Sequence, residues 1–173
     1  RAAELKSELH TVDFNSLKNV SCDISGSVFD FGDFKNLKIS ALGKYQPRNA
    51  AVALTAIEVI KKGGLHIDKS SIYKGLERFF LHARFEQICD NPPVFFDGSH
   101  NPHGVESAID SIKTYFGGQK VVLLTGVMAD KDYPEMTRQL SSVADRVSRS
   151  ALPFRLPVAG CRQAYSFLRE TSS

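Results

Sequence analysis

The chain has 173 residues, of which 42% are hydrophobic and 24% are charged, a composition typical of a globular protein. Its formal net charge is only +3, and no block of lysines and arginines interleaved with aromatic residues occurs, so the sequence does not indicate nucleic-acid binding. The three widely spaced cysteines include no CxxC pair, and no apolar run reaches the roughly 18 residues that span a bilayer, so we expect a cytoplasmic protein with reduced thiols, no zinc site and no contact with membranes.

The beginning of the chain is predicted to contain a short helix and a hairpin. Residues 1–9 have helical spacing with the charged side chains outward, and a polar linker follows them. Apolar and polar residues then alternate over residues 27–42, on both sides of a turn at Gly32-Asp33. This alternation predicts a β-hairpin that directs Leu37, Ile39 and Ala41 to one side.

Two further helices are predicted after the hairpin. The first begins at Gln46-Pro47, where proline favours the first helical position, and it ends at Gly63-Gly64. A second helix follows Asp68, a residue type that commonly caps helix N-termini. The apolar residues that face inward in these helices are Ala50, Ala53, Leu54, Ile57 and Ile60 in the first, and Ile72, Leu76 and Phe79 in the second.

The pattern changes after Arg84 to alternating strands and helices. The predicted elements are an extended segment at 84–89, a buried strand at 94–96, a helix at 105–116, a strand at 120–125 and a helix from about Pro134. The near-continuous apolar run of the 120–125 strand is typical of a parallel strand that is buried on both faces. Strand, helix, strand and helix in this order predict a mostly parallel, Rossmann-like α/β sheet with a right-handed crossover.

Polar side chains follow both predicted parallel strands. Asp97 comes directly after one strand, and the segment 126–132 (GVMADKD) follows the other. Because ligands of open parallel sheets bind outside the carboxyl ends of the strands, we expect both groups at one rim of the sheet, where functional groups meet a ligand. The Asp97 carboxylate could accept hydrogen bonds from a ribose diol, with Gly98 allowing a ligand to come close. The alternative is that Asp97 and Asn101 cap the following helix.

Arg84 and Asn49 are further candidates for nucleotide binding. Arg84 lies where the two parts of the chain meet, and its planar guanidinium could bind a phosphate, although an ion pair with Glu86 is the alternative. Asn49 lies in the first turn of a predicted helix, where backbone N–H groups attract anions and an amide can bind a base edge, but it could equally be a surface residue.

Two simple site patterns are excluded. Asp97, His100 and His103 have the spacing D-x-x-H-x-x-H, which fits the known closed sets of metal ligands poorly and has no supporting Cys or Glu nearby, so we predict no metal site in this chain. Gly43-Lys44 lacks the upstream glycine and the following Ser or Thr of a P-loop.

Four motifs in this order resemble those of the folylpolyglutamate synthase/dihydrofolate synthase family, which belongs to the Mur ligase superfamily. They are GKYQPRNAAVALTAIEVI (43–60), HARFE (82–86), DGSHNPHG (97–104) and GVMADKDYPEM (126–136). The resemblance covers about residues 1–147. It departs from the family at LHAR, where the family has a W-P-G-R pattern.

This resemblance implies an ATP-dependent ligase that adds L-glutamate to folate or dihydropteroate through an acyl phosphate. It implies that Asn49 and Asp97 contact the nucleoside of ATP and that Arg84 contacts its phosphates. His100, the candidate catalytic residue, would line the nucleotide or glutamate side of the cleft. The roles of Lys131 and Asp132 stay open, as does the choice between folate and dihydropteroate.

The resemblance also implies a domain organisation. Residues 1–82 would be the C-terminal part of a central ATP-binding domain, residues 83–148 an incomplete glutamate-ligase domain, and residues 149–173 an atypical tail. We expect the P-loop and the Mg²⁺ ligands upstream of this chain, which would be a piece of a monomeric enzyme and inactive alone. The alternatives are a fragment of a cell-wall Mur ligase, which adds an amino acid to a UDP-sugar, and a non-catalytic nucleotide-binding or interaction module.

Overall fold

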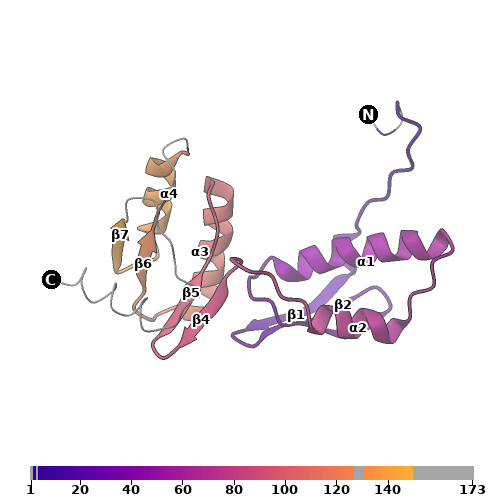
Figure 1. Ribbon diagram of the computed structural model, residues 1–173, viewed down its shortest axis with the longest axis horizontal. Coiled ribbons are helices and arrows are strands. Elements are labelled where there is room, and N and C mark those ends of the chain that lie inside the picture. Colours follow the sequence, from indigo (N-terminus) through magenta and orange to yellow (C-terminus); the bar gives the residue numbers. More distant parts are fainter. Residues whose placement is uncertain (1, 3, 127–130, 150–173) are drawn as a thin grey trace. The chain divides into compact units, whose positions relative to one another are not determined.

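The chain divides into two compact units, residues 1–80 and residues 81–173 (Figure 1). The computed structural model describes residues 2, 4–126 and 131–149. Most of the predicted tail and part of the GVMADKDYPEM motif therefore lie outside the described residues. Within the described part, no helix is long and apolar enough to cross a membrane.

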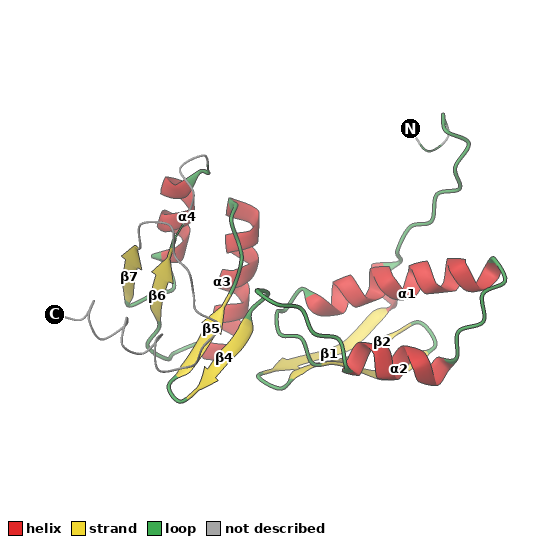
Figure 2. Ribbon diagram, in the orientation of Figure 1, coloured by secondary structure: helices red, strands yellow, loops and turns green. Residues whose placement is uncertain are grey.

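The first unit consists of a three-stranded antiparallel sheet and two helices (Figure 2). A short 3₁₀ helix, Phe14–Ser16, leads into the sheet, whose strand order is β1-β2-β3. The elements that follow it are β1 (Leu17–Asp23), β2 (Gly26–Phe31), β3 (Phe34–Ile39), α1 (Gln46–Lys62) and α2 (Lys69–Glu77).

One apolar core joins the sheet of this unit to both helices. The β2–β3 register places Phe29 opposite Leu37, and both side chains are fully buried. They pack with Ala50 and Leu54 of α1 and with Ile72 of α2. The alternating pattern of the hairpin and the three-and-four spacing of the helices thus meet in one cluster, which holds α1 in a fixed place on the sheet.

Most predictions for the first unit are confirmed. The hairpin and α1 occur as expected, and α2 starts after Asp68, although the Asp68 side chain makes no capping hydrogen bond. Phe79 was expected to face inward, but α2 ends at Glu77 and Phe79 is 38% exposed. Ala53 and Ile60 of α1 were also expected to face inward, but both are exposed, Ile60 to 47%. The helix expected over residues 1–9 is wrong, since the described residues there form only turns and coil.

The second unit has an α/β fold that includes a parallel strand pair. Its elements are β4 (Glu86–Asp90), β5 (Pro93–Phe96), α3 (Pro102–Phe116), β6 (Val122–Thr125), α4 (Tyr133–Leu140) and β7 (Arg146–Arg149). The α/β class is therefore as predicted. Among the described residues β6 pairs with β7 in parallel, whereas β4 and β5 form a separate antiparallel hairpin.

Two apolar clusters stabilise the second unit, and α3 contributes to both. Val105 and Ile109 of α3 pack against Met136 and Leu140 of α4. At the other end of α3, four aromatic rings gather with centroid separations between 4.9 and 6.3 Å, those of Phe85, Phe95, Tyr115 and Phe116. The segment that precedes β4 is therefore anchored to α3 through Phe85.

The predicted strands of this unit are present but less buried than expected. Val122 in β6 is 55% exposed, so the prediction that this strand is buried on both faces is wrong. Phe96 in β5, which was expected to be a buried strand, is 36% exposed. The physical reason is the pairing, because β5 bonds to β4 and β6 bonds to β7 rather than to each other. The strand β7 had not been predicted.

Candidate functional site

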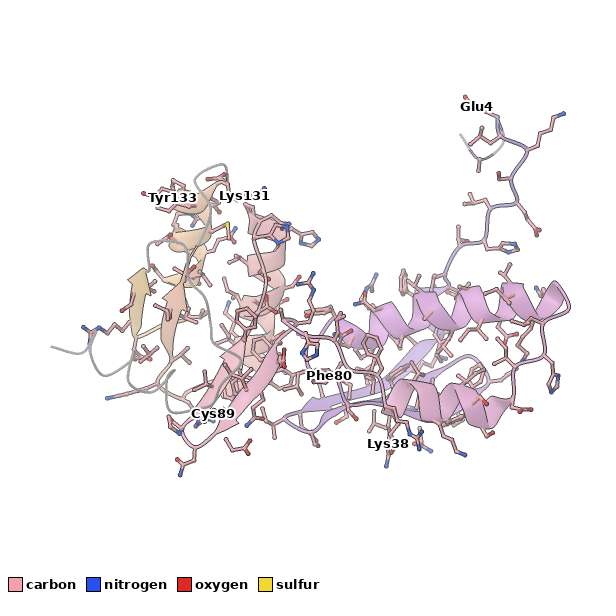
Figure 3. All side chains as sticks on the ribbon, viewed as in Figure 1. Glu4, Lys38, Phe80, Cys89, Lys131 and Tyr133 are labelled. Atoms are coloured by element: carbon pink, nitrogen blue, oxygen red, sulfur yellow. The ribbon has the colours of Figure 1, made fainter. Side chains whose placement is uncertain are left out.

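The carboxyl ends of β5 and β6 point toward the same end of the second unit. Figure 1 shows both strands running toward the end at which α3 and α4 begin, and the contact of Val105 with Met136 keeps the first turns of these helices together. Asp97 follows β5 directly, and Lys131 lies just before α4, where Figure 3 labels it. The loop between 126 and 131 lies outside the described residues.

Asp97 ties the loop after β5 to the chain segment before β4. One carboxylate oxygen, Oδ2, accepts a hydrogen bond from the Phe85 N–H at 2.8 Å. The other, Oδ1, accepts the Ser99 N–H at 2.9 Å and the Ser99 hydroxyl. In parallel, the Gly98 N–H donates to the Ala83 carbonyl at 2.9 Å. Asp97 therefore holds the backbone of two segments that are 12 residues apart.

The two residues proposed as alternative helix caps behave differently. Asn101 is the N-cap of α3, and its side-chain oxygen accepts the Gly104 N–H at 2.8 Å. Asp97 does not cap α3, because its bonds go to Phe85 and Ser99. The capping alternative is thus confirmed for Asn101 and wrong for Asp97.

The backbone on both sides of Arg84 has a left-handed conformation. Ala83 has φ 55° and Phe85 has φ 51°, which is unfavourable by about 1–2 kcal/mol for each L-residue. Two carboxylates compensate, because Glu86 accepts the Ala83 N–H at 2.8 Å and Asp97 accepts the Phe85 N–H. Residues 82–86, which we call the joint, are therefore held by side-chain to backbone hydrogen bonds.

The Arg84 side chain is exposed at the joint. Its Nη1 donates to the Ala83 carbonyl at 3.1 Å. The Glu86 carboxylate, the expected alternative partner of Arg84, instead bonds the Ala83 N–H and approaches His82 Nδ1 at 3.2 Å. A Cβ at Gly98 would lie 3.1 Å from Arg84 Nη1 and 3.2 Å from the Ala83 carbonyl. A side chain at position 98 would therefore be tight against the joint and would require its neighbours to shift by a few tenths of an ångström.

His100 is exposed and its ring is oriented by the same loop. Its Nδ1 lies 3.0 Å from the Gly98 carbonyl, and because a carbonyl only accepts, Nδ1 carries the proton and Nε2 is left for other contacts. His103 lies 3.8 Å from Glu106 at the surface. The described residues contain no group of three or more His, Cys, Asp or Glu that could hold a metal ion.

Asn49 belongs to the first unit and is exposed on α1. Its Nδ2 donates to Gln46 Oε1 at 3.3 Å, and Gln46 Nε2 donates to the Leu42 carbonyl at 3.3 Å. Gln46 is only 1% exposed, which makes it one of the few buried polar side chains of this unit. The sequence analysis had treated Gln46 only as a helix start, although a glutamine beside a helix-starting proline among apolar residues was a usable signal.

Lys131 and Asp132 directly precede α4. Asp132 is the N-cap of α4 and accepts the Glu135 N–H at 3.3 Å. Glu135 in turn bonds Arg138 through two contacts of 2.6 and 2.8 Å, which lower the pKa of the Glu135 carboxyl and raise the pKa of Arg138. The described geometry thus gives Asp132 a capping role, and Lys131 is half-buried beside it.

Of the four predicted site residues, the structure brings three together. Arg84, Asp97 and His100 belong to one hydrogen-bonded assembly in the second unit, built from the joint and the loop after β5. Asn49 lies in the first unit. The sequence did not reveal the roles of the partners that shape this assembly, above all those of Ser99 and of Glu86, which was expected only as an ion-pair partner of Arg84.

Comparison with known proteins gives a consistent family. Residues 83–151 match the family described as "Mur ligase, glutamate ligase domain". The chain is 27% identical over 161 residues to the dihydrofolate synthase/folylpolyglutamate synthase of Bacillus subtilis, an alignment that covers 86% of this chain and 37% of the relative. It is 32% identical over 134 residues to the folylpolyglutamate synthase of Lacticaseibacillus casei, with 77% of this chain and 30% of the relative covered.

Solved structures agree with these relatives. A complex of folylpolyglutamate synthase with AMPPCP and folate superposes with a TM-score of 0.80 and 27% identity, over 98% of this chain and 42% of that chain. The chain thus spans about a third of the length of the curated relatives it matches. The glutamate ligase domain and the likeness of the chain to solved relatives lead to one conclusion: residues 83–151 belong to the Mur ligase glutamate ligase domain family, and the chain is similar over most of its length to one part of folylpolyglutamate and dihydrofolate synthases.

Proposed function

We propose that this chain is part of an ATP-dependent ligase that joins L-glutamate to folate or dihydropteroate. A substrate carboxylate oxygen would attack the γ-phosphorus of ATP, which forms an acyl phosphate and releases ADP. The amine of glutamate would then attack the acyl carbon, lose a proton and displace inorganic phosphate, so that an amide bond forms. The names of the relatives and the AMPPCP and folate in a solved relative support this proposal.

The conformation of the joint is the observation that carries the proposal. Its backbone is fixed on both sides of Arg84 by the carboxylates of Glu86 and Asp97, while the guanidinium itself is exposed. An arginine held in this way is suited to bind phosphate oxygens through its planar fork of donors. We therefore assign Arg84 to the phosphates of ATP.

The other candidate residues receive complementary roles in this proposal. Asp97 Oδ2 accepts one hydrogen bond in the structure, and a carboxylate oxygen can accept two, so it can also accept a bond from a nucleoside hydroxyl. Asn49 contributes its exposed amide to the nucleoside. His100 would present Nε2 to the nucleotide or to glutamate.

The domain assignment and the metal belong to the same proposal. The family match begins at residue 83, which supports residues 83–148 as the glutamate-ligase domain and residues 1–82 as the C-terminal part of the ATP-binding domain. The described residues do not fit a Mg²⁺ site, since they contain no cluster of three acidic, His or Cys side chains. No step of the reaction is therefore assigned to a metal bound by them.

Calorimetric titration of the chain with ATP tests the proposal. We expect measurable binding and a loss of about tenfold for Arg84→Ala, equivalent to about 1.4 kcal/mol, the lower part of the range for a hydrogen bond to a charged group. Lys113→Ala, which removes an exposed cation from α3, is the control and should bind as the original chain does.

A second measurement follows the reaction itself. Labelled glutamate should be incorporated into tetrahydrofolate or dihydropteroate by the full parent enzyme and not by this chain alone. Ligation of an amino acid to a UDP-sugar by the parent enzyme would instead favour the cell-wall ligase. A stable chain that binds no ATP would favour the non-catalytic interaction module.

A further inference from the structure

Glu86 occupies an unusual place for a carboxylate of a short hairpin strand. It is the first residue of β4, and its side chain is only 15% exposed. The side chain contacts the residues of the joint that precede it. Its Oε2 accepts the Ala83 N–H at 2.8 Å, and its Oε1 lies 3.2 Å from His82 Nδ1. Both carboxylate oxygens of Glu86 therefore contact the two residues that precede Arg84, His82 and Ala83.

The contacts of Glu86 and Asp97 form a matched pair around Arg84. Glu86 receives the N–H of the left-handed residue before Arg84, and Asp97 receives the N–H of the left-handed residue after it. The second of these residues, Phe85, is also anchored by its ring in the aromatic cluster. Ala83 has no such anchor in its methyl side chain, so its conformation depends on Glu86 and on the bond from the Gly98 N–H.

We infer that Glu86 is a positioning residue that aims the Arg84 guanidinium at the phosphates of ATP by holding Ala83 in its left-handed conformation. This inference rests on the proposed function, in which Arg84 binds phosphate. If Ala83 relaxed to an ordinary conformation, the peptide that leads into Arg84 would rotate and the guanidinium would leave its place beside Gly98.

Removal of the Glu86 carboxylate should change the affinity for ATP in opposite directions, depending on whether Glu86 acts by positioning Arg84 or only by its charge. Glu86 carries a negative charge close to the residue that is to bind a polyanion. If charge alone decided, removal of this carboxylate would reduce repulsion and strengthen the binding of ATP. Positioning predicts the opposite result, because a misdirected Arg84 loses its phosphate contacts.

The experiment compares ATP affinity, measured by calorimetry, among variants of the intact chain. Glu86→Ala should weaken ATP binding about tenfold, whereas Glu86→Gln should stay within about threefold of the original chain because its amide oxygen can still accept the Ala83 N–H. Ala83→Gly combined with Glu86→Ala should recover part of the loss, because glycine adopts positive φ without the steric cost. Glu106→Ala, which removes an exposed carboxylate next to His103, is the matched control and should change the affinity less than twofold.

Amide hydrogen exchange at Ala83 and Phe85 supplies a readout that does not depend on ATP. Glu86→Ala should accelerate exchange at Ala83 and leave Phe85 protected by Asp97. If Glu86→Ala does not fold, the Ala83→Gly/Glu86→Ala variant is compared with Ala83→Gly alone, and we expect the same direction of loss.

The outcomes distinguish the two proposals. ATP binding that Glu86→Ala leaves unchanged or strengthens would overturn the positioning role and leave the proposed function intact. An original chain that binds no ATP while its Ala83 amide is protected would overturn the proposed function for this chain, and Glu86 would then have only a structural role.

Discussion

The two units hold their candidate binding residues by different means. In the first unit, Asn49 is exposed on a 17-residue helix whose opposite face packs into an apolar core, so the fold does not depend on the candidate residue. In the second unit, β5 and β6 have four residues each and are half-exposed, and carboxylates hold the loops through backbone N–H groups. There the candidate residue Asp97 is also part of what stabilises the local structure.

The largest expected effect comes from a change in the apolar core of the first unit. Leu54→Ala removes a fully buried side chain between α1 and the sheet, and we expect the free energy of unfolding of the first unit to fall by about 2–5 kcal/mol. Val52→Ala on the exposed face of the same helix is the control and should change it by less than about 0.5 kcal/mol. Chemical denaturation followed by circular dichroism measures both, and equal losses would contradict the assigned core.

A smaller effect is expected from the carboxylate that ties the second unit. Asp97→Ala leaves the Phe85 N–H without its acceptor in a residue that is 3% exposed, so we expect a loss of about 1–3 kcal/mol in the stability of this unit. Asp97→Asn keeps one acceptor oxygen and should lose less. Asp110→Ala on the exposed face of α3 serves as the control in the same denaturation experiment. A stability of Asp97→Ala equal to that of the control would show that the hydrogen bonds of Asp97 do not stabilise this unit.

The smallest effect concerns pH and brings a carboxylate of the first unit into the comparison. The Asn36 N–H, the Asn19 amide and the charge of Lys35 lower the pKa of the Asp30 carboxyl. Because the pKa of Asp30 is lower in the folded state, its ionised carboxylate stabilises the fold fully at pH values above the ordinary pKa of an Asp. This stabilisation is lost as the pH falls through the lowered pKa.

Asp30→Asn should therefore flatten the acid limb of the stability–pH profile of the first unit. Asp33→Asn, in the exposed turn between β2 and β3, removes the same charge and is the control. Thermal unfolding at a series of pH values from neutral to acidic measures the difference, and profiles that coincide for all three chains would show that the Asp30 network carries no acid-sensitive stability.

The sequence predicted best where structure depends on local periodicity. The hairpin of β2 and β3 and the helix α1 have clear alternation, clear spacing and glycine ends, and they form as expected. The strand β1 was missed because most of its side chains are exposed and polar, so it has no apolar pattern of its own and is specified by its pairing with β2. The strand β7 is equally short of apolar residues and is specified by pairing with β6.

The sequence indicated where the candidate site lies, but not which hydrogen bonds hold its residues. An acid directly after a strand of an α/β unit indicated Asp97, and the resemblance indicated Arg84. The bonds that engage them depend on two non-glycine residues, Ala83 and Phe85, adopting positive φ, which their residue types do not signal. For the same reason Glu86 was considered only as an ion-pair partner of Arg84, and its bond to the Ala83 N–H became apparent only in three dimensions.

The construction of the joint has a practical consequence. Main-chain N–H groups of the joint donate to the carboxylates of Glu86 and Asp97, and the Arg84 side chain donates to the neighbouring Ala83 carbonyl. The side chain at position 84 can therefore be exchanged while the backbone of the joint keeps its conformation. A cysteine introduced there and coupled to an environment-sensitive fluorophore would place a reporter where the native guanidinium now sits, and its emission would report changes in the conformation of the joint.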